Sequence, residues 1–384
     1  MNPTLLALVR RLDINIDFNE WSPNSIDRWV EIEPRLLKEE SVVHLFHQLV
    51  ELEELEISGA SRIIQLILYQ EDPTRLPFPF LSTLKALDLV STFDFLPSSS
   101  DRLFVLRDAN LGQFKELTQL SLDVRHDARS AQLEQITTEV SVQFPPNLED
   151  LSLSGNLSSS IWDFPSLPFP EKLTALSLYE IGDTSHLFSR LQHFVKEPQQ
   201  IKNFQLWLSN DDSDFSQDED PLQELSKYGN LTSLTVQGPW VPTTSEFYST
   251  IARLPLSHLS FKIDTEVSTT ELIKLIATSS SSSSDPTSTN RCLQRITLDN
   301  VDAFRGESLP RDQGADAVRD ADLIGLGWNL ANWTETFSRQ GLKELVEVAK
   351  REGIAIDGYA VQSLEIEDAW EEEMRYYREV TGSL

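Results

Sequence analysis

The sequence predicts an α/β solenoid, in which short parallel strands form a sheet and helices lie behind it. A phrase of the form apolar-x-x-apolar-x-apolar occurs nine times, beginning at Leu52, Leu84, Leu117, Leu148, Leu173, Ile201, Leu231, Leu256 and Leu293. These starts are 25 to 37 residues apart, and self-similarity at such a period is typical of stacked repeats. Several intervals between the copies also carry apolar residues at helical spacing.

The last three positions of each phrase are expected to form a short strand. Its two apolar side chains point into the core, while the residues between and beside them point to the opposite face. One unit cannot bury its own apolar face, so neighbouring units must stack. Strands are predicted near residues 12, 55, 87, 120, 151, 176, 204, 234, 259 and 296. Nine strands at roughly 4.8 Å spacing would form an inner surface roughly 40 Å long, enough for a whole protein domain.

The first predicted strand belongs to an irregular copy at Val9–Ile14, 43 residues before Leu52. Helices are predicted over residues 41–50, 184–195, 245–254 and 269–277, and after the Asp220-Pro221 pair. An acidic loop at 209–220 and a serine run at 279–284 interrupt the pattern, and the serine run is expected to be a flexible excursion.

The chain is predicted to comprise a solenoid over residues 1–300, an irregular insert over 301–340 and a helical C-terminal cap over 341–384. Such a cap would cover the core that the last repeat exposes. Within it we predict a helix through Leu342 and Ala349, a short strand at 353–356 and a charged helix over 360–380. A final strand at 361–366, which also fits the repeat spacing, is the less favoured alternative.

Composition limits the classes of partner. With 61 Asp and Glu against 32 Lys and Arg, the net charge is −29, which opposes binding to nucleic acid or an anionic membrane. The charge favours solubility and is compatible with a basic protein partner, but a solvated acidic surface without a partner is the favoured interpretation of composition alone. A single cysteine, Cys292, excludes an intrachain disulfide framework and indicates a reducing compartment, the cytoplasm or nucleus. The first residues lack a secretory apolar region, and no run of 18 apolar residues occurs.

The repeated phrase, which covers most of the chain, is similar to that of the leucine-rich-repeat superfamily, and the units resemble ribonuclease-inhibitor-like horseshoes. The segments NPTLLALVRRLDI and LKELVEVAKREGIAIDG further resemble the repeat region of fungal F-box proteins. The resemblance implies a horseshoe with a concave parallel sheet. In that family the repeats hold substrates for a cullin–RING ubiquitin ligase, and the F-box binds the Skp adaptor of the ligase. No F-box precedes the first unit, because Met1 falls directly at it. We therefore expect either a truncated relative or a free-standing repeat protein. The asparagine that often follows the second apolar strand residue occurs only as Asn156.

The concave face is the predicted partner-binding surface. Over the first four regular strands its outward positions carry five acids and no base, with aromatics farther along and two bases near the far end. Contacts are expected at Glu54, Glu56, Asp88, Asp123, Asp150, Tyr179, Gln205, Trp207, Lys262 and Arg295. Large aromatics beside small polar residues are typical of interface anchors, so Tyr179 and Trp207 are predicted anchors and the acids are predicted to face a basic surface. The alternative is a solvated face whose aromatics pack on rim loops.

No motif predicts catalysis, a metal or a cofactor. His44 and His47 are three apart on a predicted helix, but a metal needs further ligands, so a surface pair is favoured. Residues 210–220 lack the glycine and terminal glutamate of a calcium loop, while Ser209 and Ser216 fit an acidophilic kinase. We predict a non-enzymatic protein-binding scaffold that is monomeric alone. The alternatives are a regulatory or inhibitory repeat protein that occludes a partner and, less favoured, a GTPase-activating repeat protein.

Overall fold

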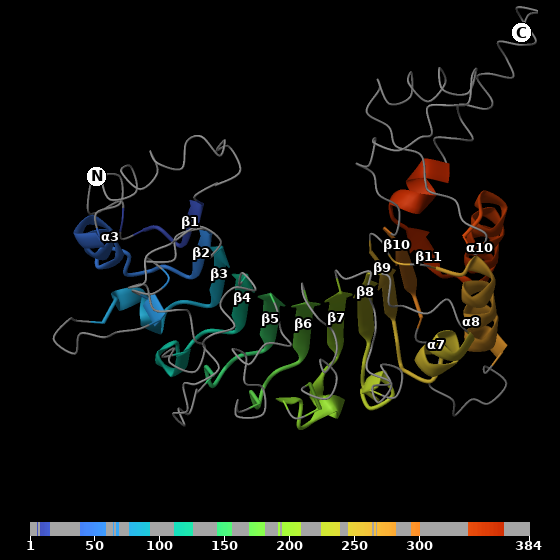
Figure 1. Cartoon of the computed structure of the whole chain (residues 1–384), viewed down its shortest axis with the longest axis horizontal. Helices are drawn as coiled ribbons and strands as arrows, with labels where there is room; N and C mark the ends of the chain where they lie inside the picture. Colours follow the sequence, from blue (N-terminus) through green and yellow to red (C-terminus); the bar gives the residue numbers. More distant parts are fainter. Residues whose placement is uncertain are drawn as a thin grey trace, which may run out of the picture. The chain divides into compact units, whose positions relative to one another are not determined.

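The fold is an open, all-parallel sheet with few helices (Figure 1). The computed structural model describes residues 6, 8–15, 39–58, 64, 67–68, 77–92, 111–125, 144–155, 169–180, 191–192, 194–208, 224–238, 245–262, 265, 267–281, 293–299 and 337–364. Among these residues are eleven strands, and their order in the sheet is their order in the chain. This arrangement confirms the predicted α/β class with a solenoid-like parallel sheet. The acidic loop at 209–220, most of the segment 301–340 and Cys292 lie outside the described residues.

The chain divides into two compact units, which are described separately: Met1–Ile201 with Asp214–Glu219, and Lys202–Ser213 with Asp220–Leu384. The first unit contains β1 (Arg11–Asn15), β2 (Glu54–Ser58), β3 (Ala86–Thr92), β4 (Gln119–Arg125), β5 (Asp150–Gly155) and β6 (Ala175–Glu180). It also contains helix α3 (Glu39–Phe46) and the single-turn 3-10 helices η2 (Pro79–Ser82), η4 (Leu111–Gln113) and η8 (Pro198–Gln200). Equivalent positions of successive copies pair without slippage, as Leu55 with Leu87 and Leu87 with Leu120.

The second unit contains β7 (Asn203–Leu208), β8 (Ser233–Gln237), β9 (His258–Phe261), β10 (Arg295–Leu298) and β11 (Ala355–Asp357), together with helices α7 (Ser245–Ile251), α8 (Thr269–Ser281) and α10 (Arg339–Glu352). The three helices lie along one side of the strands, with α8 between α7 and α10 (Figure 1). β11 corresponds to the predicted short strand. Residues 359–364 are helical, so the alternative strand at 361–366 does not form over its described part. α8 continues to Ser281, which makes the first three residues of the serine run helical instead of a flexible excursion.

Burial alternates along β2, β5, β7, β8 and β10 as predicted, whereas in β9 Ser260 is buried together with its neighbours Leu259 and Phe261. In β2, Leu55 and Ile57 are buried, whereas Glu54, Glu56 and Ser58 remain at least partly exposed. β5, β7 and β8 repeat this pattern. Because successive side chains point to opposite faces of a strand, the alternation separates a buried face from a polar one. We call the polar face of each unit its open face.

Buried aromatic residues reinforce the apolar core. Phe80 and Phe114 lie four and three residues before a phrase, and both are completely buried. Phe80 meets Phe46 of α3 edge-on, with ring centroids 5.5 Å apart. In the second unit Tyr228 takes the same place before its phrase and stacks on Phe204 at 5.1 Å. Such pairs add stabilisation beyond the area they bury.

Backbone hydrogen bonds join the residues that directly precede the strands. The carbonyl of Glu53 accepts hydrogen bonds from the amides of Lys85 and Ala86. In the next repeat, the carbonyl of Lys85 accepts hydrogen bonds from the amides of Thr118 and Gln119. The second unit repeats this arrangement, since the carbonyl of Thr232 accepts the amides of Ser257 and His258. Each unit thereby satisfies the polar groups at the start of its strands, which buried backbone requires.

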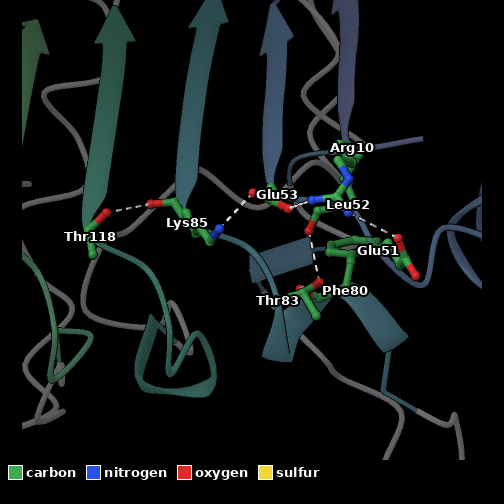
Figure 2. Close-up of polar contacts among 8 residues, drawn as sticks. All are labelled: Arg10, Glu51, Leu52, Glu53, Phe80, Thr83, Lys85 and Thr118. Carbon is green, nitrogen blue, oxygen red and sulfur yellow. Dashed lines mark hydrogen bonds and ion pairs between the residues drawn. The ribbon is translucent and has the colours of Figure 1, made fainter. Parts of the chain in front are cut away.

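Side chains extend this contact in the first unit, as Figure 2 shows. Glu53 pairs with Arg10 on one side and with Lys85 Nζ, 2.7 Å away, on the other. The hydrogen bond from Lys85 is the largest of the interactions that hold the pKa of Glu53 below its usual value. Thr118 Oγ1 donates to the Lys85 carbonyl at 3.2 Å, and Thr83 Oγ1 donates to the Leu52 carbonyl at 2.8 Å (Figure 2).

Helix α10 begins at a defined cap. Ser338 has extended backbone geometry, and its side-chain oxygen accepts the amide of Gly341 at 3.1 Å. Ser338→Ala is therefore expected to lower the free energy of unfolding by about 1 kcal/mol in urea denaturation. Gln340→Ala, at an exposed position in the first turn, is the control and should change it by less than about 0.5 kcal/mol. Equal losses in both variants would contradict the capping role.

Candidate functional site

Strand register arranges the open face of the first unit in rows of side chains. The first row runs from β1 to β6 through Arg11, Glu54, Ala86, Gln119, Asp150 and Ala175. The second row runs through Asp13, Glu56, Asp88, Ser121, Ser152 and Ser177. Neighbouring strands are about 4.8 Å apart, so these side chains can interact across the sheet. Acidic residues gather at the β1–β3 end, and small residues dominate the rows from β4 onward.

A hollow of about 280 Å³ lies on this face over β2 to β5. Its polar and small lining residues are Arg11, Glu54, Glu56, Ala86, Asp88, Gln119, Ser121, Asp150 and Ser152. We call this region the acidic hollow, because it has four carboxylates and, among its described lining residues, one base. The hollow exists because Ala86, Ser121 and Ser152 are short, while longer side chains stand around them.

The single base pairs with the carboxylates at one end. Arg11 lies 3.4 Å from Glu54 and 3.8 Å from Glu56, measured between guanidinium nitrogens and carboxylate oxygens. Asp88 and Asp150 form no ion pair within the described part of the chain. The charge of Arg11 is therefore directed to β2, and the carboxylates of Asp88 on β3 and Asp150 on β5 have no cation among the described residues.

Asp88 and Asp150 are half-buried, and this burial changes their acidity. Burial raises the pKa of Asp88; a hydrogen bond from Ser121 opposes the rise, and repulsion from Asp123 adds to it. Burial likewise raises the pKa of Asp150. One carboxylate oxygen of Asp88, Oδ1, is buried without a hydrogen-bond partner in the described structure. Both groups thus lose hydration without gaining a cation in exchange.

Four of the predicted contact residues, Glu54, Glu56, Asp88 and Asp150, lie together in the hollow. Asp123 lies on β4 two residues after Ser121, in the row that follows the second one, and its charge repels that of Asp88. The sequence prediction missed Arg11 and Asp13 on β1, because only the regular copies of the phrase were counted for this face. The irregular copy at Val9–Ile14 contained the signal that would have found them.

The two predicted aromatic anchors belong to different units. Tyr179 lies on β6 in the first unit, in register with Ser154, and is half-buried. Trp207 lies on β7 in the second unit, in register with Gln237, and is also half-buried. Gln205, two positions before Trp207, pairs in register with Thr235 on the same open face.

The open face of the second unit differs because its predicted bases are paired with acids. Lys262 Nζ lies 2.7 Å from Asp299, and Arg295 Nε donates to Asp357 at 2.7 Å. Burial opposes ionisation of Asp357, but hydrogen bonds from Arg295 and Thr297 outweigh it and lower its pKa. The charges of Lys262 and Arg295 are thus compensated within their own unit.

The histidine pair makes local contacts. His44 Nε2 accepts a hydrogen bond from the Gln48 amide nitrogen at 2.7 Å, and the His47 ring lies 5.2 Å from that of Phe78. In the described ranges, no three His, Cys, Asp or Glu side chains are grouped as metal ligands. None of the described helices combines the length and the apolarity that crossing a membrane requires.

Comparisons with known proteins add no family assignment: no family model matches the chain, and no curated protein sequence is significantly similar to it. The function of the chain must therefore be inferred from the repeated phrase, the sheet and its open face. Of these, the acidic hollow is the feature with the most specific chemistry.

Proposed function

We propose that this chain is a leucine-rich-repeat scaffold that binds another protein on the open face of its sheet and catalyses no reaction. The acidic hollow is the observation that carries the proposal. It combines short side chains with two carboxylates, those of Asp88 and Asp150, that have no cation within the described part of the chain, and a cationic group of a partner could pair with them. The nine copies of the phrase support the leucine-rich-repeat assignment.

The architecture supports a binding role because parallel sheets are normally covered on both faces. Here the buried face carries the leucines of the phrase, while residues such as Glu56 and Ser152 on the other face remain half-exposed. Solenoid proteins characteristically use the sheet surface of their repeats to bind other macromolecules. A net charge of −29 favours a basic protein over nucleic acid as that partner.

The more specific form of the proposal is a substrate-recognition arm of the F-box kind, acting in a ubiquitin ligase. The resemblance of the segment from Leu342 to Gly358 supports this form, and in the structure that segment forms most of helix α10 and all of strand β11. In the free-standing alternative, the same open face occludes a single partner.

A bulky residue in the hollow tests the binding role. Ser152→Trp, on β5, is expected to abolish capture of the partner that the tagged wild-type chain retains in affinity purification. Glu171→Trp, at an exposed turn before β6, introduces the same side chain away from the hollow and should leave capture unchanged. Circular dichroism of both variants checks that each one folds.

The identities of the captured proteins separate the two forms of the proposal. Skp adaptor and cullin peptides would support the ligase arm, and one stoichiometric partner without them would support occlusion. Capture by Ser152→Trp at the wild-type level would contradict binding at the open face.

A further inference from the structure

We propose that the acidic hollow binds a cationic side chain, arginine or lysine, from a basic segment of the partner protein. This inference rests on the proposed function and specifies the chemistry of the partner. The occupant follows from the charge of the hollow, from the way Arg11 already pairs there, and from the contrast with the second unit.

The negative charge of the hollow is only partly compensated by the described residues. Its described lining has four carboxylates and one guanidinium, and Asp13 and Asp123 extend the acidic area on either side. On the open face of the second unit, by contrast, Lys262 and Arg295 each have a carboxylate within 3 Å. The excess of negative charge is therefore a local property of β1 to β5 as well as a consequence of the acidic composition.

Arg11 shows within the chain how a guanidinium uses this surface. Its two terminal nitrogens lie near two different carboxylates, one on Glu54 and one on Glu56. Arg11 approaches from β1, at the edge of the described strands, and its ion pairs within the described part of the chain are with residues of β2. Farther along the face, Asp88 and Asp150 offer the same chemistry without a cation, and the short side chains of Ser121 and Ser152 leave room above the sheet.

The energetics favour a cation over a neutral group. Half-burial removes part of the hydration of Asp88 and Asp150, and the elevated pKa values of both groups reflect this loss. A cation that enters the hollow would stabilise the ionised carboxylates and so replace the hydration that they lose through burial. Arginine and lysine also have long apolar stems, which can pass over Ala86 and the serines while the charged head reaches the carboxylates.

The test measures binding of short labelled peptides by fluorescence anisotropy at about 0.15 M salt, where long-range attraction is screened. The probes are three acetylated peptides of equal length with a glycine-serine background, which contain three arginines, three lysines or three glutamates. The arginine and lysine peptides are expected to bind the wild-type chain, and the glutamate peptide is not. Their relative affinities show which cation the hollow prefers.

The variant Asp88→Asn with Asp150→Asn removes two charges from the hollow and should weaken binding of the cationic peptides about tenfold. The control, Glu116→Gln with Glu171→Gln, removes two charges at exposed turns before β4 and β6. It should change binding less than about twofold. Equal weakening in both variants would show general attraction to an acidic chain and would overturn the inference, as would unchanged binding in the hollow variant.

Two further readouts separate this inference from misfolding and from the proposed function. The asparagine variant should be at least as stable as the wild type, because it removes carboxylates that are desolvated and unpaired, so lost binding would not reflect unfolding. If Ser152→Trp abolishes partner capture while the asparagine variant retains both capture and peptide binding, the scaffold function stands and the cation site is refuted. If neither variant affects capture, both proposals fail.

Discussion

Leu153→Ala is expected to lower the free energy of unfolding by about 2–5 kcal/mol. Leu153 lies on β5 with 0% of its surface exposed, and it pairs in register with Leu122 and Leu178 on the two adjacent strands. Truncation removes apolar contacts on both sides at once. The surrounding leucines belong to a hydrogen-bonded sheet, so they cannot move freely to fill the space.

Ser152→Ala is the matched control, since it changes the preceding residue of the same strand on the opposite, open face. It should alter stability by less than about 0.5 kcal/mol. Urea denaturation followed by circular dichroism and tryptophan fluorescence measures both variants. Comparable losses at the two positions would mean that the sheet does not have one buried and one open face, and the binding proposal would then lose its surface.

The strands could be predicted because one short phrase determines both their position and their burial. Leu-x-Leu puts two side chains on the same face of a strand, and the repeat period brings equivalent leucines side by side. Thus Leu120, Leu151 and Leu176 occupy consecutive strands in register, which the sequence alone implied. The same arithmetic predicted that Glu54, Glu56, Asp88 and Asp150 share a face.

The ion pairs could not be predicted in the same way. Arg295 pairs with Asp357, 62 residues later, because β11 joins β10 although no regular copy of the phrase includes β11. Lys262 pairs with Asp299, 37 residues later in the chain, and the two residues directly follow the neighbouring strands β9 and β10. Both contacts depend on side-chain conformation as well as register. Two residues that the sequence suggested as partner-binding bases are consequently occupied within their own unit.

The aromatic residues before the phrase were also missed, for a different reason. Phe80 and Phe114 precede their phrases by four and three residues, so their spacing is not constant. The intervening turns compensate for this difference and place both rings in the core. A pattern with fixed spacing detects the strands, because strand geometry allows one spacing between buried residues. It does not detect the aromatic residues, because the turns before the strands differ in length.

Gly238→Ala is expected to destabilise the second unit by more than about 3 kcal/mol. Gly238 directly follows β8 with φ +108°, and a Cβ there would lie 2.0 Å from the carbonyl oxygen of Leu208, the last residue of β7. The atom in its way belongs to the backbone of a neighbouring strand, so relief would require the two strands to separate. Gly358 has the same φ after β11, and its added Cβ would lie 2.5 Å from the carbonyl oxygen of Leu298 at the end of β10.

Gly353→Ala separates this crowding from backbone strain alone. Gly353 ends helix α10 with φ +73°, but nothing lies within 4 Å of an added Cβ, so the loss should be only about 1 kcal/mol. Denaturant unfolding of Gly238→Ala and Gly353→Ala under identical conditions gives the comparison. A similar small loss in both variants would show that β7 and β8 do not approach so closely at their ends. A much larger loss at Gly238 would establish that glycine at this position is required by the contact between successive repeats, as it is at Gly358.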